Sequence, residues 1–212
     1  MTVPEFLINK FKEWKTNIFE TNKDYFKKIS KLDQKPKAMI ISCCDSRVQP
    51  MSIFKAEIGE LFIHKNIANL VPSIETHYNE STTFSAIEYA IISLKIPNII
   101  ILGHSNCGGI KYGYKKLSEN KSDKNFDYLN KWIDILEPAY KNIENQKGSN
   151  DILTLLEKKS IENSIINLTK FPVVKKAIKE KNLNIYGFWY DISKGKLFNY
   201  NQDTKLFEDI ST

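Results

Sequence analysis

The sequence predicts an α/β fold, with a mainly parallel central β-sheet flanked by helices and an N-terminal helical arm. Three short, uniformly apolar runs indicate buried strands, at residues 38–41, 61–63 and 98–102. Apolar residues recur at helical spacing over residues 82–94, between the second run and the third. Uniformly apolar strands that alternate with helices are typical of a parallel sheet covered on both faces.

The other elements of the core complete this pattern. A brief helix is expected at residues 50–54, in the connection between the first two strands. Residues 126–182 have a helical pattern, and one helix is expected to stop before Pro172, since proline interrupts the helical hydrogen bonds. Two aromatic runs flank the Ser-Lys-Gly at residues 193–195, which predicts a C-terminal β-hairpin.

The N-terminal segment has a pattern of its own. Aromatic and apolar residues recur at roughly helical spacing among polar residues over residues 3–30. So many aromatic side chains on an end segment need a surface to cover, and a neighbouring subunit would provide one. We therefore expect one domain over residues 1–212. It would consist of an arm, residues 1–34, that packs on a neighbouring subunit, and an α/β core, residues 35–212.

Composition disfavours several classes of function. Thirty-one Lys and Arg against 25 Asp and Glu give a net charge of +6, yet Arg47 is the only arginine. A nucleic-acid reader normally uses several guanidinium groups, so no nucleic-acid partner is expected. The longest apolar run, residues 99–102, is too short to span a bilayer, and residues 1–15 lack the apolar core of a signal peptide. Three cysteines, an odd number, argue against a disulfide framework, so we expect a cytoplasmic enzyme without a membrane partner.

Metal-binding residue types follow two of the predicted strands. Cys43, Cys44 and Asp45 follow the first strand, and His104 and Cys107 follow the third. The carboxyl ends of parallel strands lie at one edge of the sheet, where ligands collect. Thiolate and imidazole are ligands that zinc favours, and three protein ligands with one open position describe a catalytic zinc site. Each cysteine taken alone also fits a small core residue, whereas the combination favours a metal site.

The alternation of an extended chain separates the two adjacent cysteines. Side chains two residues apart share a face, so Cys43 and Asp45 point the same way and Cys44 points away. We therefore interpret Cys43 as the ligand and Cys44 as a filler or a redox-sensitive neighbour.

Several stretches in one order form a more specific pattern. They are Cys-x-Asp-Ser-Arg at residues 43–47, Asn-Ile-Ala-Asn-Leu-Val-Pro at 66–72, Ala-Ile-Glu-Tyr-Ala at 86–90, His-x-x-Cys at 104–107, Gly-Gly-Ile at 108–110 and Tyr-Gly-Phe-Trp-Tyr at 186–190. With these motifs the sequence resembles the β-class carbonic anhydrases over nearly its whole length.

The resemblance implies reversible hydration of carbon dioxide to bicarbonate and a proton by a zinc-bound hydroxide. Zn²⁺ would be held by Cys43, His104 and Cys107. Asp45 would accept the proton of the hydroxide in a hydrogen bond, and Arg47 would hold Asp45 off the metal through a paired hydrogen bond. In a closed state, with that pair open, Asp45 would become the fourth metal ligand.

The resemblance also implies a substrate pocket and an assembly. Gln34 would hydrogen-bond the substrate or bicarbonate, and the backbone N–H of Gly108 would face the same ligand. Phe62, Ile67 and Tyr89 would line a narrow, mostly apolar pocket, reaching in from the neighbouring subunit of a homodimer or tetramer. Plain core packing explains Phe62 and Ile67 equally well from sequence alone.

Two positions depart from one subgroup of the family. The bicarbonate-inhibited subgroup has Trp and Arg where this chain has Ile40 and Lys65, so the chain looks more like the plant-type subgroup. His64 and His77 are both candidates for a proton shuttle, although a single histidine is more often a packing or surface residue.

Two other functions compete with this interpretation. A zinc hydrolase of the same fold that acts on carbon disulfide or carbonyl sulfide would use the same metal chemistry. A non-catalytic zinc-binding or redox-sensing module would be favoured only if Asp45 or Arg47 were missing, and both are present.

Overall fold

The computed structural model describes residues 2–75, 81–146 and 151–211 of the 212-residue chain. The chain divides into two compact units, Met1–Lys35 and Pro36–Thr212. Within the described ranges, none of the helices combines the length and the apolar character that crossing a membrane needs.

The first unit is helical, as its aromatic spacing predicts. Helix α1, Glu5–Trp14, continues as a π-helical turn, Lys15–Phe19, and helix α2, Lys23–Ile29, follows. Trp14 contacts Phe26 with 5.6 Å between ring centroids, so the two helices share some aromatic contacts. No residue of these three elements is buried within the described structure. Much of the apolar surface of this unit therefore lacks cover, with the Phe6 side chain 66% exposed.

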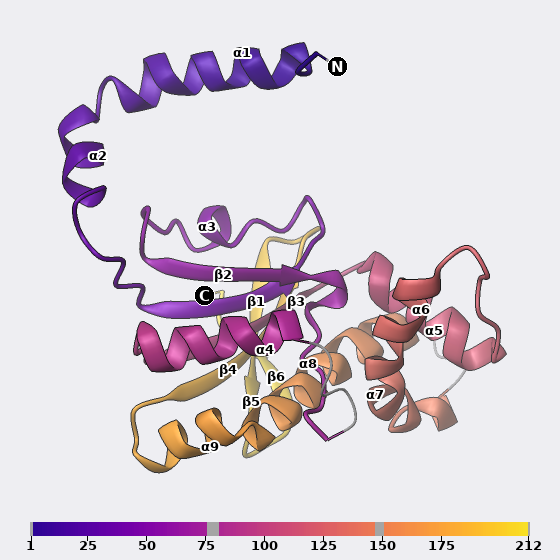
Figure 1. Cartoon of the computed structure of the whole chain (residues 1–212). Helices are drawn as coiled ribbons and strands as arrows, with labels where there is room; N and C mark the ends of the chain where they lie inside the picture. The colour runs from indigo at the N-terminus through magenta and orange to yellow at the C-terminus, as the bar shows by residue number, and fades with distance from the viewer. Residues whose placement is uncertain (1, 76–80, 147–150, 212) are drawn as a thin grey trace. The chain divides into compact units, whose positions relative to one another are not determined.

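The second unit contains one six-stranded sheet, in the order β2-β1-β3-β4-β5-β6 (Figure 1). The strands are β1 Ala38–Cys43, β2 Leu61–Asn66, β3 Asn98–His104, β4 Asn184–Asp191, β5 Lys196–Asn201 and β6 Leu206–Asp209. The first four strands in this order pair in parallel, and the last two pairings are antiparallel. The predicted α/β fold with a mainly parallel sheet is confirmed, and β4 and β5 form the predicted hairpin.

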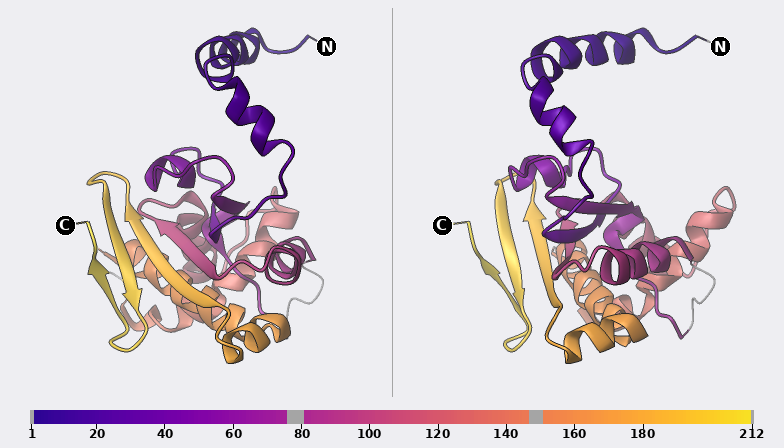
Figure 2. Two further views of the ribbon diagram at one scale, coloured as in Figure 1. Left: turned by 90° about the vertical axis from the view of Figure 1, so that its left-hand side faces the viewer. Right: turned by 60° about the vertical axis from the view of Figure 1, so that its left-hand side comes forward.

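Helices cover the sheet and its carboxyl edge (Figures 1 and 2). They are α3 Pro50–Ile53, α4 Ser81–Glu88, α5 Gly108–Glu119, α6 Asp127–Ile133, α7 Glu137–Lys141, α8 Ile152–Lys170 and α9 Pro172–Lys179. Helices α4, α8 and α9 pack on one face of the sheet, where Ile41 and Ile101 are fully buried. Residues of α3 pack on the other face, around Ile40 and Leu102. A further core, formed by α5 to α8, includes Cys43 and Cys107 and therefore encloses the carboxyl edge of the sheet.

All three predicted strands extend beyond their apolar runs, β1 to Cys43 and β2 to Asn66. The third strand does not end before Gly103 but continues to His104, because both residues pair with β4. A side chain at Gly103 would lie 2.7 Å from a carbon of Ile161 on α8, so glycine allows this helix to pack close to the sheet. The helix predicted over residues 82–94 is α4 followed by a π-helical turn, Tyr89–Ser93.

Candidate metal centre

The sheet brings the two chemistry-bearing loops together. Strand β1 ends at Cys43 and β3 ends at His104, and the two strands pair in parallel with Ser42 beside Leu102. The loop after β3 turns sharply at Asn106, whose φ of 56° lies in the left-handed region, and delivers Cys107 to the N-cap of α5. The loop is also tied to β4, because the Ser105 main-chain N–H donates to the Tyr190 carbonyl at 2.9 Å.

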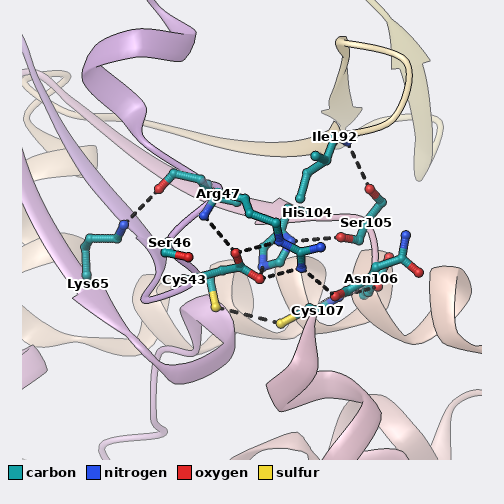
Figure 3. Close-up of polar contacts among 12 residues, drawn as sticks. Cys43, Ser46, Arg47, Lys65, His104, Ser105, Asn106, Cys107 and Ile192 are labelled. Carbon is teal, nitrogen blue, oxygen red and sulfur yellow. Dashed lines mark hydrogen bonds and ion pairs between the residues drawn. The ribbon is translucent and has the colours of Figure 1, made fainter.

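Three possible metal ligands meet at this edge of the sheet (Figure 3). The Sγ atoms of Cys43 and Cys107 and a ring nitrogen of His104 all lie within 4.8 Å of one another. The two sulfur atoms are 3.8 Å apart, and all three residues are buried. This is the only such group of three or more Cys, His, Asp or Glu residues in the described part of the chain.

The hydrogen bonding of His104 leaves one of its ring nitrogens available to a metal. His104 Nδ1 lies 2.9 Å from the Ser105 carbonyl oxygen. A carbonyl can only accept, so Nδ1 carries the proton and Nε2 keeps a free lone pair. Within the described residues His104 Nε2 is buried without a hydrogen-bond partner. A buried, unpaired nitrogen beside two thiols fits a metal ion that would bind all three.

The pKa values of the three groups shift because the groups lie against one another. The pKa of Cys43 is lowered, first because the Cys107 thiol donates toward its sulfur. The pKa of Cys107 is raised by the same contact and by burial. Burial lowers the pKa of His104, but the adjacent Cys43 sulfur and the Ser105 carbonyl outweigh it and raise the pKa overall. A divalent cation would hold both sulfurs as thiolates, since only the deprotonated form ligates.

Asp45 and Arg47 form an ion pair next to the cluster. Asp45 Oδ1 accepts hydrogen bonds from the main-chain N–H and Nε of Arg47, both at 2.9 Å, and Oδ2 accepts one from Nη2 at 2.7 Å. These bonds hold the pKa of Asp45 well below its usual range, so the carboxylate is ionised. Its Oδ2 atom lies 3.9 Å from His104 Nε2. Arg47 Nη2 also donates to the Asn106 carbonyl at 3.3 Å, which links the pair to the ligand loop.

The other predicted site residues are more dispersed. Cys44 is exposed and lies outside the three-ligand cluster. Gly108 is the first residue of α5, and no atom lies within 4 Å of the position that a side chain would occupy there. Ile67 packs over the first turn of α5, against Gly109. Gln34 belongs to the first unit of the chain, so its role stays a prediction.

The rings of Phe62 and Tyr89 contact each other, with 6.0 Å between centroids, and the Tyr89 side chain is 48% exposed. His64 Nε2 lies 3.1 Å from Thr83 Oγ1, and burial lowers the pKa of His64. His77, the other shuttle candidate, lies outside the described residues.

Sequence reasoning missed one buried carboxylate next to the cluster. Glu157 on α8 is 3% exposed, and it accepts hydrogen bonds from the Cys107 main-chain N–H and from Trp189 Nε1. Burial raises the pKa of Glu157, and these two donors partly offset that effect. One signal was available, because Glu157 lies four residues before Ile161 and eight before Ile165, on the apolar stripe of the helix.

Comparisons with known proteins agree with this geometry. A model of the carbonic anhydrase family matches residues 38–197. Beta carbonic anhydrase 3 of Arabidopsis thaliana is 35% identical over 198 residues, which cover 92% of this chain and 76% of the relative. A carbonic anhydrase of Helicobacter pylori strain J99 is 33% identical over 204 residues, which cover 93% of this chain and 90% of the relative.

Solved structures give the same result. The β-carbonic anhydrase CcaA superposes with a TM-score of 0.89 at 25% identity, covering 98% of this chain and 92% of that one. A tetrameric β-carbonic anhydrase from the ascomycete Sordaria macrospora superposes with a TM-score of 0.79 at 26% identity, covering 92% of this chain and 95% of that one. The chain therefore belongs to the carbonic anhydrase family and, within it, to the β class of zinc-dependent enzymes that hydrate carbon dioxide.

Proposed function

We propose that this chain hydrates carbon dioxide at a zinc site formed by Cys43, His104 and Cys107, with Asp45 and Arg47 as its catalytic pair. The observation that carries the proposal is the buried cluster of two thiols and one imidazole with an ionised carboxylate held beside it. Zinc supplies a Lewis acid at such a site and makes water acidic enough to provide a nucleophile near neutral pH.

Asp45 accepts the proton of the attacking water or hydroxide in a hydrogen bond. A carboxylate that already accepts three hydrogen bonds from Arg47 has a fixed orientation, which supports this role. The acceptor directs the lone pair of the nucleophile toward carbon dioxide without moving during the reaction, and such preorganisation lowers the activation barrier. The product is bicarbonate with one proton released to solvent.

Arg47 keeps Asp45 available for this task. Two thiolates would neutralise a divalent cation, so a third anionic ligand would add little to metal affinity. A free Asp45 carboxylate, 3.9 Å from His104 Nε2, is nevertheless close enough to compete with water for the remaining ligand position. The forked hydrogen bonds of the guanidinium oppose that movement. With the pair opened, Asp45 would be free to serve as the fourth ligand and to close the site.

The substrate pocket is completed by a second copy of the chain. Phe62, Ile67 and Tyr89 contribute an apolar lining that suits an uncharged substrate, and Gln34 and the Gly108 N–H hydrogen-bond the ligand. The exposure of Phe6 and of other apolar side chains of residues 3–30 supports an arm that packs on the neighbouring subunit. We assign a homodimer or tetramer, in agreement with the tetrameric enzymes of Sordaria macrospora.

Individual residues support an assignment of the subgroup and of the compartment. Ile40 is fully buried in the sheet core, and Lys65 Nζ donates to the Val48 carbonyl at 2.8 Å, so neither is free to form the regulatory pocket of the bicarbonate-inhibited subgroup. We therefore assign the plant-type subgroup. All three cysteines are free thiols, which suits a reducing compartment such as the cytoplasm.

Stopped-flow measurement of carbon dioxide hydration, together with the zinc content of the same sample, tests the proposal. We expect about one zinc per chain and a rate that disappears on chelation and returns with zinc. Parallel assays with carbonyl sulfide and carbon disulfide test the competing hydrolase function. Zinc-loaded protein that hydrolyses either of these and does not hydrate carbon dioxide would overturn the proposed reaction.

A further inference from the structure

We propose that Glu157 is a positioning residue for the metal centre, acting together with Trp189 to fix the Cys107 ligand from the side of α8. The inference rests on the proposed zinc site but concerns a residue outside the ligand set and the Asp45–Arg47 pair. Glu157 is buried in the hydrophobic core, with only 3% of the residue exposed. A buried carboxylate is costly unless it is paired or hydrogen-bonded, so its partners are informative.

Both oxygens of Glu157 accept hydrogen bonds from groups in different elements. Oε1 accepts the Cys107 main-chain N–H at 3.0 Å, and Oε2 accepts the indole Nε1–H of Trp189 on β4 at 3.1 Å. The ring of Trp189 in turn lies under the Lys158 ammonium, 4.7 Å from the ring centroid to Nζ. A positive charge therefore lies against the same indole, where it favours the buried negative charge.

This arrangement acts on a metal ligand through its backbone. Cys107 is the N-cap of α5, so its N–H precedes the helix and has no carbonyl within α5 to bond. The bond to Glu157 fixes the peptide that carries the Cys107 side chain, and therefore the direction of its sulfur. Arg47 Nη2 donates to the Asn106 carbonyl, which belongs to the same peptide group as the Cys107 N–H, so this one peptide is held at both its oxygen and its nitrogen. Outer partners of this kind commonly contribute about 10- to 100-fold to metal affinity.

The partners of Glu157 require a carboxylate rather than an amide. Both groups that face it are N–H donors, and a carboxylate presents an acceptor to each. Glutamine has nearly the same shape but only one oxygen, so its NH₂ group would face either Cys107 or Trp189. Glu157→Gln would therefore leave one buried donor unpaired. In a Trp189→Phe background the clash between two donors disappears, because the single oxygen can serve Cys107 and no N–H faces the amide NH₂ group.

The experiment compares Glu157→Gln, Trp189→Phe and the double variant with the full-length wild type. Zinc affinity is measured by competition with a chelator, and the thiolate-to-metal absorption bands are recorded after loading with Co²⁺. The matched control is Glu162→Gln, which makes the same chemical change on α8 at a residue whose carboxylate pairs with Lys159 at 2.6 Å.

We expect Glu157→Gln to weaken zinc binding about 10- to 100-fold and to alter the Co²⁺ bands. The Glu162→Gln control should leave both unchanged. In the Trp189→Phe background the same Glu157→Gln change should cost less than about threefold, a non-additivity that a general loss of stability would not produce. If Glu157→Gln alone does not fold, the comparison of Trp189→Phe with the double variant still decides the question.

Unchanged zinc affinity and Co²⁺ bands in Glu157→Gln would overturn the inference, as would a double variant that binds zinc more than about tenfold more weakly than Trp189→Phe. Failure of the wild type to bind either metal would instead overturn the proposed zinc site, so the two proposals fail separately.

Discussion

Arg47→Ala tests whether the guanidinium keeps the Asp45 carboxylate available for catalysis. The side chain gives Asp45 two hydrogen bonds, from Nε at 2.9 Å and from Nη2 at 2.7 Å. The Arg47 main-chain N–H gives a third at 2.9 Å, which alanine would retain. The substitution therefore removes two of the three restraints on the carboxylate and leaves the metal ligands intact.

The size of the effect follows from those two bonds. Removing a preorganised hydrogen-bonding partner at a catalytic site commonly lowers the rate by about 10²- to 10³-fold. The 53% exposure of the Arg47 side chain lets water screen the ion pair, which places the expected loss at the lower end of this range or somewhat below it. The released carboxylate would then occupy the position that water needs.

The assay measures carbon dioxide hydration at pH 7 and at higher pH, with the zinc content of each sample. Arg47→Ala should retain zinc at least as tightly as the wild type and lose about 30-fold or more of the rate at pH 7. Some activity should return at higher pH, because hydroxide competes better with the carboxylate. Since Arg47 is the only arginine, a guanidinium-specific reagent should reproduce the loss in the wild type.

Two control variants test whether the loss of rate depends on the geometry of the guanidinium and on this particular ion pair. Arg47→Lys keeps the charge without the forked geometry and should be intermediate in rate. Lys170→Ala removes an exposed ion pair with Glu75, 2.9 Å long, and should leave the rate unchanged. A wild-type rate at pH 7 in zinc-loaded Arg47→Ala would refute the reasoning, since Asp45 would then need no side-chain restraint.

Three further predictions test the ligands, the packing and the arm. Cys43→Ser and Cys107→Ser should each lose most of the zinc while Cys44→Ser retains it, as measured by metal analysis. Loss of zinc in Cys44→Ser with retention in Cys43→Ser would contradict the alternation of side chains along β1. Gly103→Ala should reduce the free energy of unfolding by about 1–3 kcal/mol in urea titrations, because the added methyl would lie 2.7 Å from a side chain on α8; an unchanged midpoint would show that the helix shifts freely. Deletion of residues 3–30 should cause aggregation or loss of activity, measured by light scattering and the hydration assay, and a fully active monomer would argue against the arm as a subunit contact.

Local patterns in the sequence were sufficient for the fold class and for the position of the candidate site. Apolar runs marked β1, β2 and β3, and the parallel pairing of β1 with β3 follows from their uniform hydrophobicity. Because parallel strands present their carboxyl ends at one edge, residues 61 and 64 positions apart were expected to meet, and Cys43, His104 and Cys107 do lie together. The family motifs then indicated the reaction, and the comparisons confirm the class.

The exact end of the third strand was decided by its neighbour. The third strand was expected to end before Gly103, because glycine has no intrinsic preference for extended structure. Pairing with Trp189 and Tyr190 on β4 nevertheless carries the strand through Gly103 to His104. The close approach of α8 gives that glycine a packing role that no local pattern describes.

Features that depend on neighbours along the chain could therefore be predicted from the order of residues: the periodicity of strands and helices, the turn signals, and the motifs with their spacing. Which groups from distant segments hydrogen-bond one another became visible only in the folded chain. Glu157 bonds the N–H of Cys107, 50 residues away, and the indole of Trp189, 32 residues away. A hydrogen bond needs its donor and acceptor within about 3 Å of each other and in line. Here that geometry depends on how closely α8 packs on the sheet. The order of residues along the helix or along a strand does not specify this distance.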